Sequence, residues 1–123
     1  MTRSRTQTGT DATEVFFDEL RRRGYEPALA RAKGVLRFDV ADTSKHRHRW
    51  LVRLDRGDIT VSRADLKADC TIRVEKAVFD RVATGHVNTV AAMLRGTIEA
   101  EGDIALFVLF QRLFPAPPRP DKR

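Results

Sequence analysis

The sequence is poor in cysteine and has no long hydrophobic run. Its single cysteine, Cys70, excludes an internal disulfide and is typical of a protein from a reducing compartment. The polar first residues, MTRSRTQTGTDATE, lack the apolar stretch of a secretory signal. The longest apolar run spans residues 104–110, and a membrane-spanning helix needs roughly 20 residues. We therefore expect a cytoplasmic protein.

Motifs for catalysis, phosphate binding and metal binding are also missing. The sequence contains no glycine-rich phosphate loop, no nucleophile elbow and no paired-cysteine zinc motif. His46 and His48 share one face of a predicted strand, but the basic residues beside them would repel a dication. Cys70 falls at an inward-facing strand position, where a thiol is typically buried and inert. We therefore expect no catalytic residue, no cofactor and no metal.

Positive charge is in excess. The formal net charge is +6 and the isoelectric point is about 10.2, which favours anionic partners such as acidic lipid headgroups or nucleic acid. The basic run KHRHRWLVR offers Trp50 as its one aromatic platform, and single-stranded nucleic acid is normally held by several. The run is most simply a solvated face. Attraction to an anionic membrane surface or an acidic partner is the alternative, and nucleic acid is the least favoured ligand.

The hydrophobic pattern predicts one α+β domain. Helical spacing of apolar residues begins after Asp11 or Thr13, either of which could cap a first helix. Period-two alternation then predicts strands over 35–42, 46–55, 58–64 and 69–76, with a tight hairpin turn at 56–58. Two short helices, a fifth strand over 97–101 and a last helix after Asp103 complete the order. This order predicts a five-stranded, mainly antiparallel sheet covered on one face by helices.

Three segments follow from this reading. Residues 1–10 are predicted to form a disordered basic arm, residues 11–114 the folded domain, and residues 115–123 a proline-rich basic tail.

The last helix is unusual because 104–110 contains no polar residue, although an amphipathic helix on a sheet needs only one apolar stripe. It could be fully buried, line a cavity for an apolar ligand, or bury an exposed patch in a dimer or on a membrane.

An ordered set of residues across 68–114 resembles the sterol carrier protein 2 (SCP-2) domain. The set comprises Ala68, Asp69, Phe79, Gly85, Gly96, Gly102, Asp103, Leu109, Gln111 and Leu113. The resemblance implies a lipid-binding α+β domain with a hydrophobic tunnel and no intrinsic catalysis. It also implies a sterol, fatty acid, fatty acyl-CoA or phospholipid as ligand.

The resemblance makes the apolar helix a tunnel wall, with Gln111 as a polar contact for the ligand head. We expect the tunnel to be lined or gated by Phe16, Phe17, Phe79, Val82, Val90, Met93, Leu94, Leu106, Phe107, Phe110 and Phe114. The competing hypothesis is a non-catalytic interaction module, in which the apolar helix covers a partner enzyme or a second copy of the chain.

Overall fold

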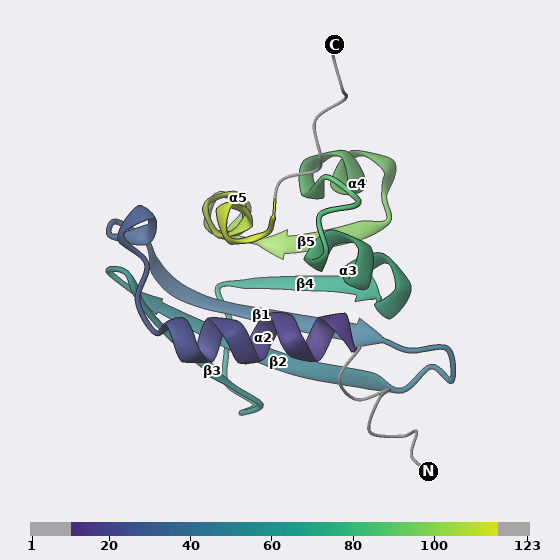
Figure 1. The fold of residues 1–123 in the computed structure, drawn as a ribbon, viewed down its shortest axis with the longest axis horizontal. Coiled ribbons are helices and arrows are strands. Elements are labelled where there is room, and N and C mark those ends of the chain that lie inside the picture. The colour runs from purple at the N-terminus through teal and green to yellow at the C-terminus, as the bar shows by residue number, and fades with distance from the viewer. Residues whose placement is uncertain (1–10, 116–123) are drawn as a thin grey trace.

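Five strands form a single sheet in the order β3-β2-β1-β4-β5. The computed structural model describes residues 11–115 (Figure 1). Residues 1–10 and 116–123 lie outside that range, as do the predicted basic arm and all of the predicted tail after Pro115. The strands are β1 (Lys33–Ala41), β2 (Arg47–Asp55), β3 (Asp58–Ser62), β4 (Cys70–Glu75) and β5 (Ile98–Gly102). The helices are α2 (Ala12–Arg23), α3 (Lys76–Ala83), α4 (Thr89–Arg95) and α5 (Ile104–Phe110), with the 3₁₀ turns η1 (Pro27–Leu29) and η2 (Gln111–Leu113).

The sheet is antiparallel except where β1 pairs with β4. The predicted α+β fold with a mainly antiparallel sheet is therefore confirmed. Alternation places one row of apolar side chains on the inner face, and across the register Phe38 lies opposite Trp50 on β2 and Ile72 on β4. These three side chains are almost completely buried. They form the floor of the hydrophobic core.

The helices cover this inner face. Helix α2 contacts β3, α3 contacts β1 and β4, and α5 contacts β1, β4 and β5. In Figure 1 α2 runs along the strands, while α5 and α4 lie toward the β5 edge. Of the two predicted caps of the first helix, Asp11 is the one used, because its carboxylate accepts the backbone N–H of Glu14. Within residues 11–115, none of the helices combines the length and apolar character needed to cross a membrane.

The connection from β3 to β4 crosses the outer face of the sheet. Its Asp65 carboxylate pairs with Arg37, 3.3 Å away, and lies 3.9 Å from Arg49. Both arginines occupy outward-facing positions: Arg37 lies between the buried Leu36 and Phe38, and Arg49 precedes the buried Trp50. Leu51 also points outward by alternation, yet it is only 2% exposed, in agreement with cover from this crossover. The crossover is what allows β4 to lie parallel to β1.

Asp69, at the end of the crossover, joins three elements. Its backbone N–H donates to the Val35 carbonyl and its carboxylate accepts the Val35 N–H, both at 2.8 Å. Its own carbonyl accepts the N–H of Asp103, also at 2.8 Å, and the Asp103 side chain caps α5. Gly102 has a φ of +105°, and a Cβ there would collide with the Asp69 carbonyl. This contact fixes where α5 begins.

The N-terminal end of α2 is tied to α3 by a partly buried polar clasp. Asp80 accepts both the backbone N–H of Thr13 (3.1 Å) and its hydroxyl (2.6 Å), and Thr13 is 3% exposed. Lys76 bridges Asp80 at 2.9 Å and Asp11 at 3.2 Å. Burial disfavours the charged form of Lys76, but the hydrogen bonds to the two carboxylates outweigh burial and raise its pKa. The clasp holds the two helices that flank the aromatic core.

We expect Gly102→Ala to destabilise the protein more than Gly96→Ala. Both glycines have a left-handed φ, and nothing lies within 4 Å of a Cβ built on Gly96. Left-handed strain alone should cost about 1–2 kcal/mol in each variant, while the collision with Asp69 should add roughly 1–3 kcal/mol at Gly102. Urea unfolding measures both values. Equal losses would show that the approach of Gly102 to Asp69 is not a steric requirement.

We expect Asp80→Ala to lower the free energy of unfolding by about 2–3 kcal/mol, because it leaves the buried Thr13 groups and Lys76 without their shared acceptor. The matched control is Asp18→Ala, which removes an exposed ion pair between Asp18 and Arg21 on α2. This loss should cost under about 0.5 kcal/mol. Thermal and urea unfolding of both variants provide the measurement. A loss at Asp80 no larger than the loss at Asp18 would contradict the clasp.

Candidate functional site

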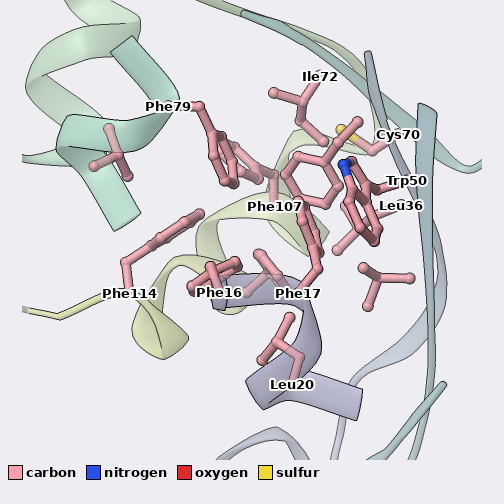
Figure 2. Close-up of a cluster of buried hydrophobic side chains, with 14 of the residues drawn as sticks. Phe16, Phe17, Leu20, Leu36, Trp50, Cys70, Ile72, Phe79, Phe107 and Phe114 are labelled. Carbon is pink, nitrogen blue, oxygen red and sulfur yellow. The ribbon is translucent and has the colours of Figure 1, made fainter. Parts of the chain in front are cut away.

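The core of the protein is a continuous network of aromatic rings. All seven phenylalanines of the sequence are buried, and each has another ring within 6.3 Å, measured between centroids. Figure 2 shows Phe16 and Phe17 of α2 facing Phe79, Phe107 and Trp50 across the layer between helices and sheet. Phe17 stacks on Trp50 at 4.5 Å and on Phe79 at 5.4 Å. This layer is therefore filled by rings from three helices and two strands, together with the ring of Phe114, which follows η2.

The apolar helix α5 is buried on one side only. Leu106, Phe107 and Phe110 face the core, while Val108 is 42% exposed. Leu106 packs so closely on Gly34 that a Cβ on this glycine would lie 2.7 Å from the leucine methyl. The helix therefore has its wide apolar surface because it covers β1, β4 and β5 at once. Its remaining apolar face points to solvent.

The expected ligand residues comprise a buried group, three residues of α4, and Gln111. A buried group belongs to or touches the ring network and consists of Phe16, Phe17, Phe79, Val82, Leu106, Phe107, Phe110 and Phe114. On α4, Met93 is half-buried and packs on the core, whereas Val90 is 40% exposed and Leu94 is 84% exposed. Gln111 is half-buried at the junction of α5 and η2, and its carbonyl accepts the N–H of Phe114. The structure thus places Val90 and Leu94 at the surface, away from the other ten.

A groove of about 460 Å³ leads to this network from the surface between α2, α3 and η2. Its volume lies within the range of small-molecule sites. Most of its lining is apolar; the lining residues are Ala12, Val15, Phe16, Glu19, Leu20, Arg23, Ala83, Thr84, Leu113 and Pro115. Phe16, in the floor of the groove, stacks face to face on Phe114 at 4.7 Å. At 7% and 8% exposure, these two rings are the most exposed of the seven phenylalanines.

Polar groups lie only at the edge of the groove. Glu19, Arg23 and Thr84 supply them. The Arg23 guanidinium pairs with Glu26 at 2.8 Å, and its side chain is 48% exposed. A half-exposed guanidinium can exchange this carboxylate for the carboxylate of a ligand, since both bind it through the same planar donors. The groove therefore combines an apolar floor with an edge that carries one cation, Arg23, and one carboxylate, Glu19.

Of the groove residues, only Phe16 was among those expected from the sequence to bind ligand. Those not expected include Val15, Leu20, Arg23 and Leu113. In the sequence, Arg23 has only the pattern of a charge that suits the C-terminal end of a helix, and Leu20 only that of an apolar helix position. Val15 lies next to Phe16 but turns to the surface, being 39% exposed. Helical periodicity could have separated Val15 from the buried stripe. Nothing local indicates that η2 lies beside α2.

The other chemistry-bearing residues have structural partners. His48 Nε2 lies 3.0 Å from the Asp42 carboxylate, and this contact, with help from Ser44, lowers the pKa of Asp42. Burial raises the pKa of the Cys70 thiol, which keeps it protonated. Trp50 is only 4% exposed and lies 3.6 Å from the Arg63 guanidinium, so it is not free to stack on a base. In the described part of the chain, no cluster of three or more His, Cys, Asp or Glu is arranged to hold a metal ion.

Solved structures share this fold. The sterol carrier protein domain 2 of Helicoverpa armigera is 18% identical with a TM-score of 0.69, covering 83% of this chain and 84% of its own. The palmitated SCP2L2 of Aedes aegypti is 17% identical with a TM-score of 0.68, covering 86% and 97%. The sec-alkylsulfatase Pisa1 of Pseudomonas sp. is 22% identical with a TM-score of 0.65, but the match covers 82% of this chain and only 16% of the sulfatase.

A search of curated protein sequences finds no match to the chain. The profile of the SCP-2 sterol transfer family, in contrast, matches residues 17–115. That range runs from Phe17 through the sheet, the Asp69 junction and α5 to the last residue of the groove. The chain therefore belongs to the SCP-2 sterol transfer family.

Proposed function

We propose that the protein binds the acyl chain of a fatty acid or fatty acyl-CoA between its helices and its sheet, and carries it without chemical change. The observation that carries the proposal is the apolar groove whose floor is the Phe16 ring, stacked on Phe114. Membership of the family supports a lipid as the ligand. The palmitate on the Aedes aegypti relative supports an acyl chain in particular.

The acyl chain enters by parting the Phe16–Phe114 stack. Phe114 follows η2 and belongs to no strand or helix, so its ring can move without shifting one. Exposing one such side chain costs about 1.5–3 kcal/mol, whereas burying about 14 methylenes contributes roughly 11 kcal/mol. An association cost of about 4 kcal/mol, the low end of the usual range, leaves a favourable balance for a long chain. Short chains bury too little to open the stack.

The polar head remains at the edge of the groove. Arg23 is the cationic group there, and its guanidinium suits a carboxylate or a phosphate. Gln111, which the sequence suggested as the head contact, lies half-buried beside Phe114. In this arrangement Gln111 contacts the chain near the gate and Arg23 holds the head.

We expect the purified protein to bind a fluorescent long-chain fatty acid in solution. Val15→Asp should weaken this binding at least tenfold, about 1.4 kcal/mol. The new carboxylate would lie in the apolar path and lose hydration when a chain enters. The matched control is Val108→Asp, because Val108 is equally exposed but lies on α5. Native mass spectrometry of the fresh protein provides an independent measurement of any bound lipid. Equal affinity in both variants would place the binding site elsewhere.

We expect Phe114→Ala to lower the free energy of unfolding of the ligand-free protein and to raise its affinity for the ligand. Removal of the ring costs roughly 2–3 kcal/mol of unfolding free energy, less than for a fully buried phenylalanine, but the ligand no longer has to displace it. Fatty acid should therefore raise the midpoint temperature of Phe114→Ala by more than it raises that of the wild type. A variant that loses both stability and affinity would show that Phe114 is a wall of the site and not its gate.

The second candidate is a non-catalytic module that docks on another protein through α5. It is favoured by the fold's occurrence within the much longer sec-alkylsulfatase chain. The exposed Val108 face of α5 would be the contact surface. This candidate is supported, and the first rejected, if native mass spectrometry finds only the mass of the protein without lipid and the protein does not bind the fluorescent fatty acid. Under that outcome Val108→Asp is the variant that should release the partner.

A further inference from the structure

One edge of the sheet is covered by the chain itself, and the other presents unpaired backbone groups within residues 11–115. At the β3 edge, the N–H of Ile59 donates to the Gly24 carbonyl at 2.8 Å. Arg21 covers the same edge by donating to the Val61 carbonyl at 3.4 Å. The other edge is β5, the outermost strand on the side opposite β3 (Figure 1). An unpaired edge offers a row of donors and acceptors to any extended chain.

The register shows which backbone groups of β5 point away from the sheet. In an antiparallel pair, residues that exchange hydrogen bonds alternate with residues that do not. Asp103 donates its N–H to the Asp69 carbonyl, so by alternation Glu101 and Glu99 also bond to β4. The N–H and C=O groups that point outward therefore belong to Ile98, Ala100 and Gly102. Among residues 11–115, these groups have no hydrogen-bond partner.

A buried row of side chains runs across the sheet and stops at the β5 edge. Trp50, Phe38, Ile72 and Ala100 lie opposite one another on four neighbouring strands. The first three are at most 4% exposed, whereas Ala100 is half-buried. Ala100 is also the smallest of the four, so an apolar side chain on an added strand could pack beside it and continue the row. The inner face therefore favours an apolar residue opposite Ala100.

The outer row of β5 is acidic. Glu99 and Glu101 are both exposed, and Glu101 pairs with Arg73 of β4 at 3.1 Å. Within residues 11–115, Glu99 forms no ion pair. Of the other elements that contact β5, α5 carries no charge, α4 carries Arg95 at its end, and β4 also carries Glu75. Three carboxylates thus face two guanidiniums, and the surplus is negative.

We propose that the β5 edge binds an extended segment of a partner protein that has the pattern basic–apolar–basic. The apolar residue lies opposite Ala100 and continues the buried row. The two basic residues lie opposite Glu99 and Glu101 on the outer face. The outward groups of Ile98, Ala100 and Gly102 supply the hydrogen bonds of the new ladder. In this mode of recognition the main chain gives affinity, and alternate side chains give specificity.

A second copy of the chain is a poor occupant of this edge. Two paired β5 strands would bring one acidic row against another, and like charges directly opposite each other destabilise a strand pair. In the antiparallel pairing centred on Ala100, Glu99 of one copy would lie opposite Glu101 of the other. Acidic residues on an exposed edge therefore oppose self-association, and the same residues select a basic strand.

The edge is separate from the groove. Among the described residues, none of β5 lines the groove between α2, α3 and η2. Binding of a strand at β5 therefore does not rest on fatty-acid binding, and the two activities can be measured apart.

The experiment is an NMR titration of the full chain with the peptide Thr-Arg-Val-Arg-Thr, the arginine peptide. We expect the amide signals of Ile98, Ala100 and Gly102 to shift and their hydrogen exchange to slow. The glutamate peptide, Thr-Glu-Val-Glu-Thr, should bind about tenfold more weakly or worse, because two attractive cross-strand pairs become repulsive. Exchange of the central valine for serine should weaken binding about threefold, because the buried row is no longer continued.

Two variants test the contacts on the protein. Glu99→Lys should bind the arginine peptide about fivefold more weakly, and should bind the glutamate peptide more tightly than the wild type does. The matched control is Asp55→Lys, which reverses an exposed strand carboxylate on β2, away from the edge. Ala100→Pro should abolish binding and retain the sheet, since it removes an N–H that faces away from β4. Circular dichroism verifies that the variants fold.

Each outcome decides the proposal. It is supported if the arginine peptide protects the three edge amides and Glu99→Lys reverses the charge preference. It is overturned if the wild type binds both peptides equally, if the shifts fall outside β5, or if Glu99→Lys behaves as Asp55→Lys does. It is also overturned if the three amides are already protected in the free protein, because another segment or a second copy then occupies the edge. If Ala100→Pro does not fold, the comparison of Glu99→Lys with Asp55→Lys still decides.

Discussion

The arrangement of this molecule depends on the hydrogen bonds of Asp69. Through its N–H and its carboxylate this residue clamps Val35 at the start of β1, and through its carbonyl it holds Asp103 at the start of α5. Three segments that are distant in the sequence therefore meet at one point. Without this junction, nothing local would direct α5 across β1, β4 and β5. The Gly102 backbone passes against the Asp69 carbonyl for the same reason, which gives a physical meaning to the Ala-Asp and Gly-Asp pairs in the SCP-2 resemblance.

The aromatic network sets the conditions for ligand binding. Stacked and edge-to-face rings occupy the layer between the helices and the sheet, and such pairs contribute about 0.5–1.5 kcal/mol each beyond the area they bury. A ligand that replaced the central rings would lose several of these contacts at once. A ligand that parts only Phe16 and Phe114 loses few of them and replaces them with its own methylenes. This difference in cost is why we propose the edge of the network, next to the groove, as the binding site.

The sequence predicted the parts of the fold that depend on local pattern. Period-two alternation located the strands and correctly assigned Phe38, Trp50 and Ile72 to the buried face. Caps at Asp11 and Asp103 marked helix starts. The parallel pairing of β1 with β4 was not predicted, because it depends on a crossover whose polar residues carry no periodic signal. The groove was missed for a related reason, since it forms between α2 and η2, which are nearly ninety residues apart.

Helix α4 shows most clearly what the hydrophobic pattern could not predict, namely which of its apolar residues are buried. Its residues TVAAMLR contain apolar side chains on every side, so the sequence assigned Val90, Met93 and Leu94 alike to the ligand site. Seven residues make only two turns, and a helix packed by Thr89, Ala92 and Met93 necessarily turns Val90 and Leu94 outward. Burial of α4 is limited by the short β5, to which it packs.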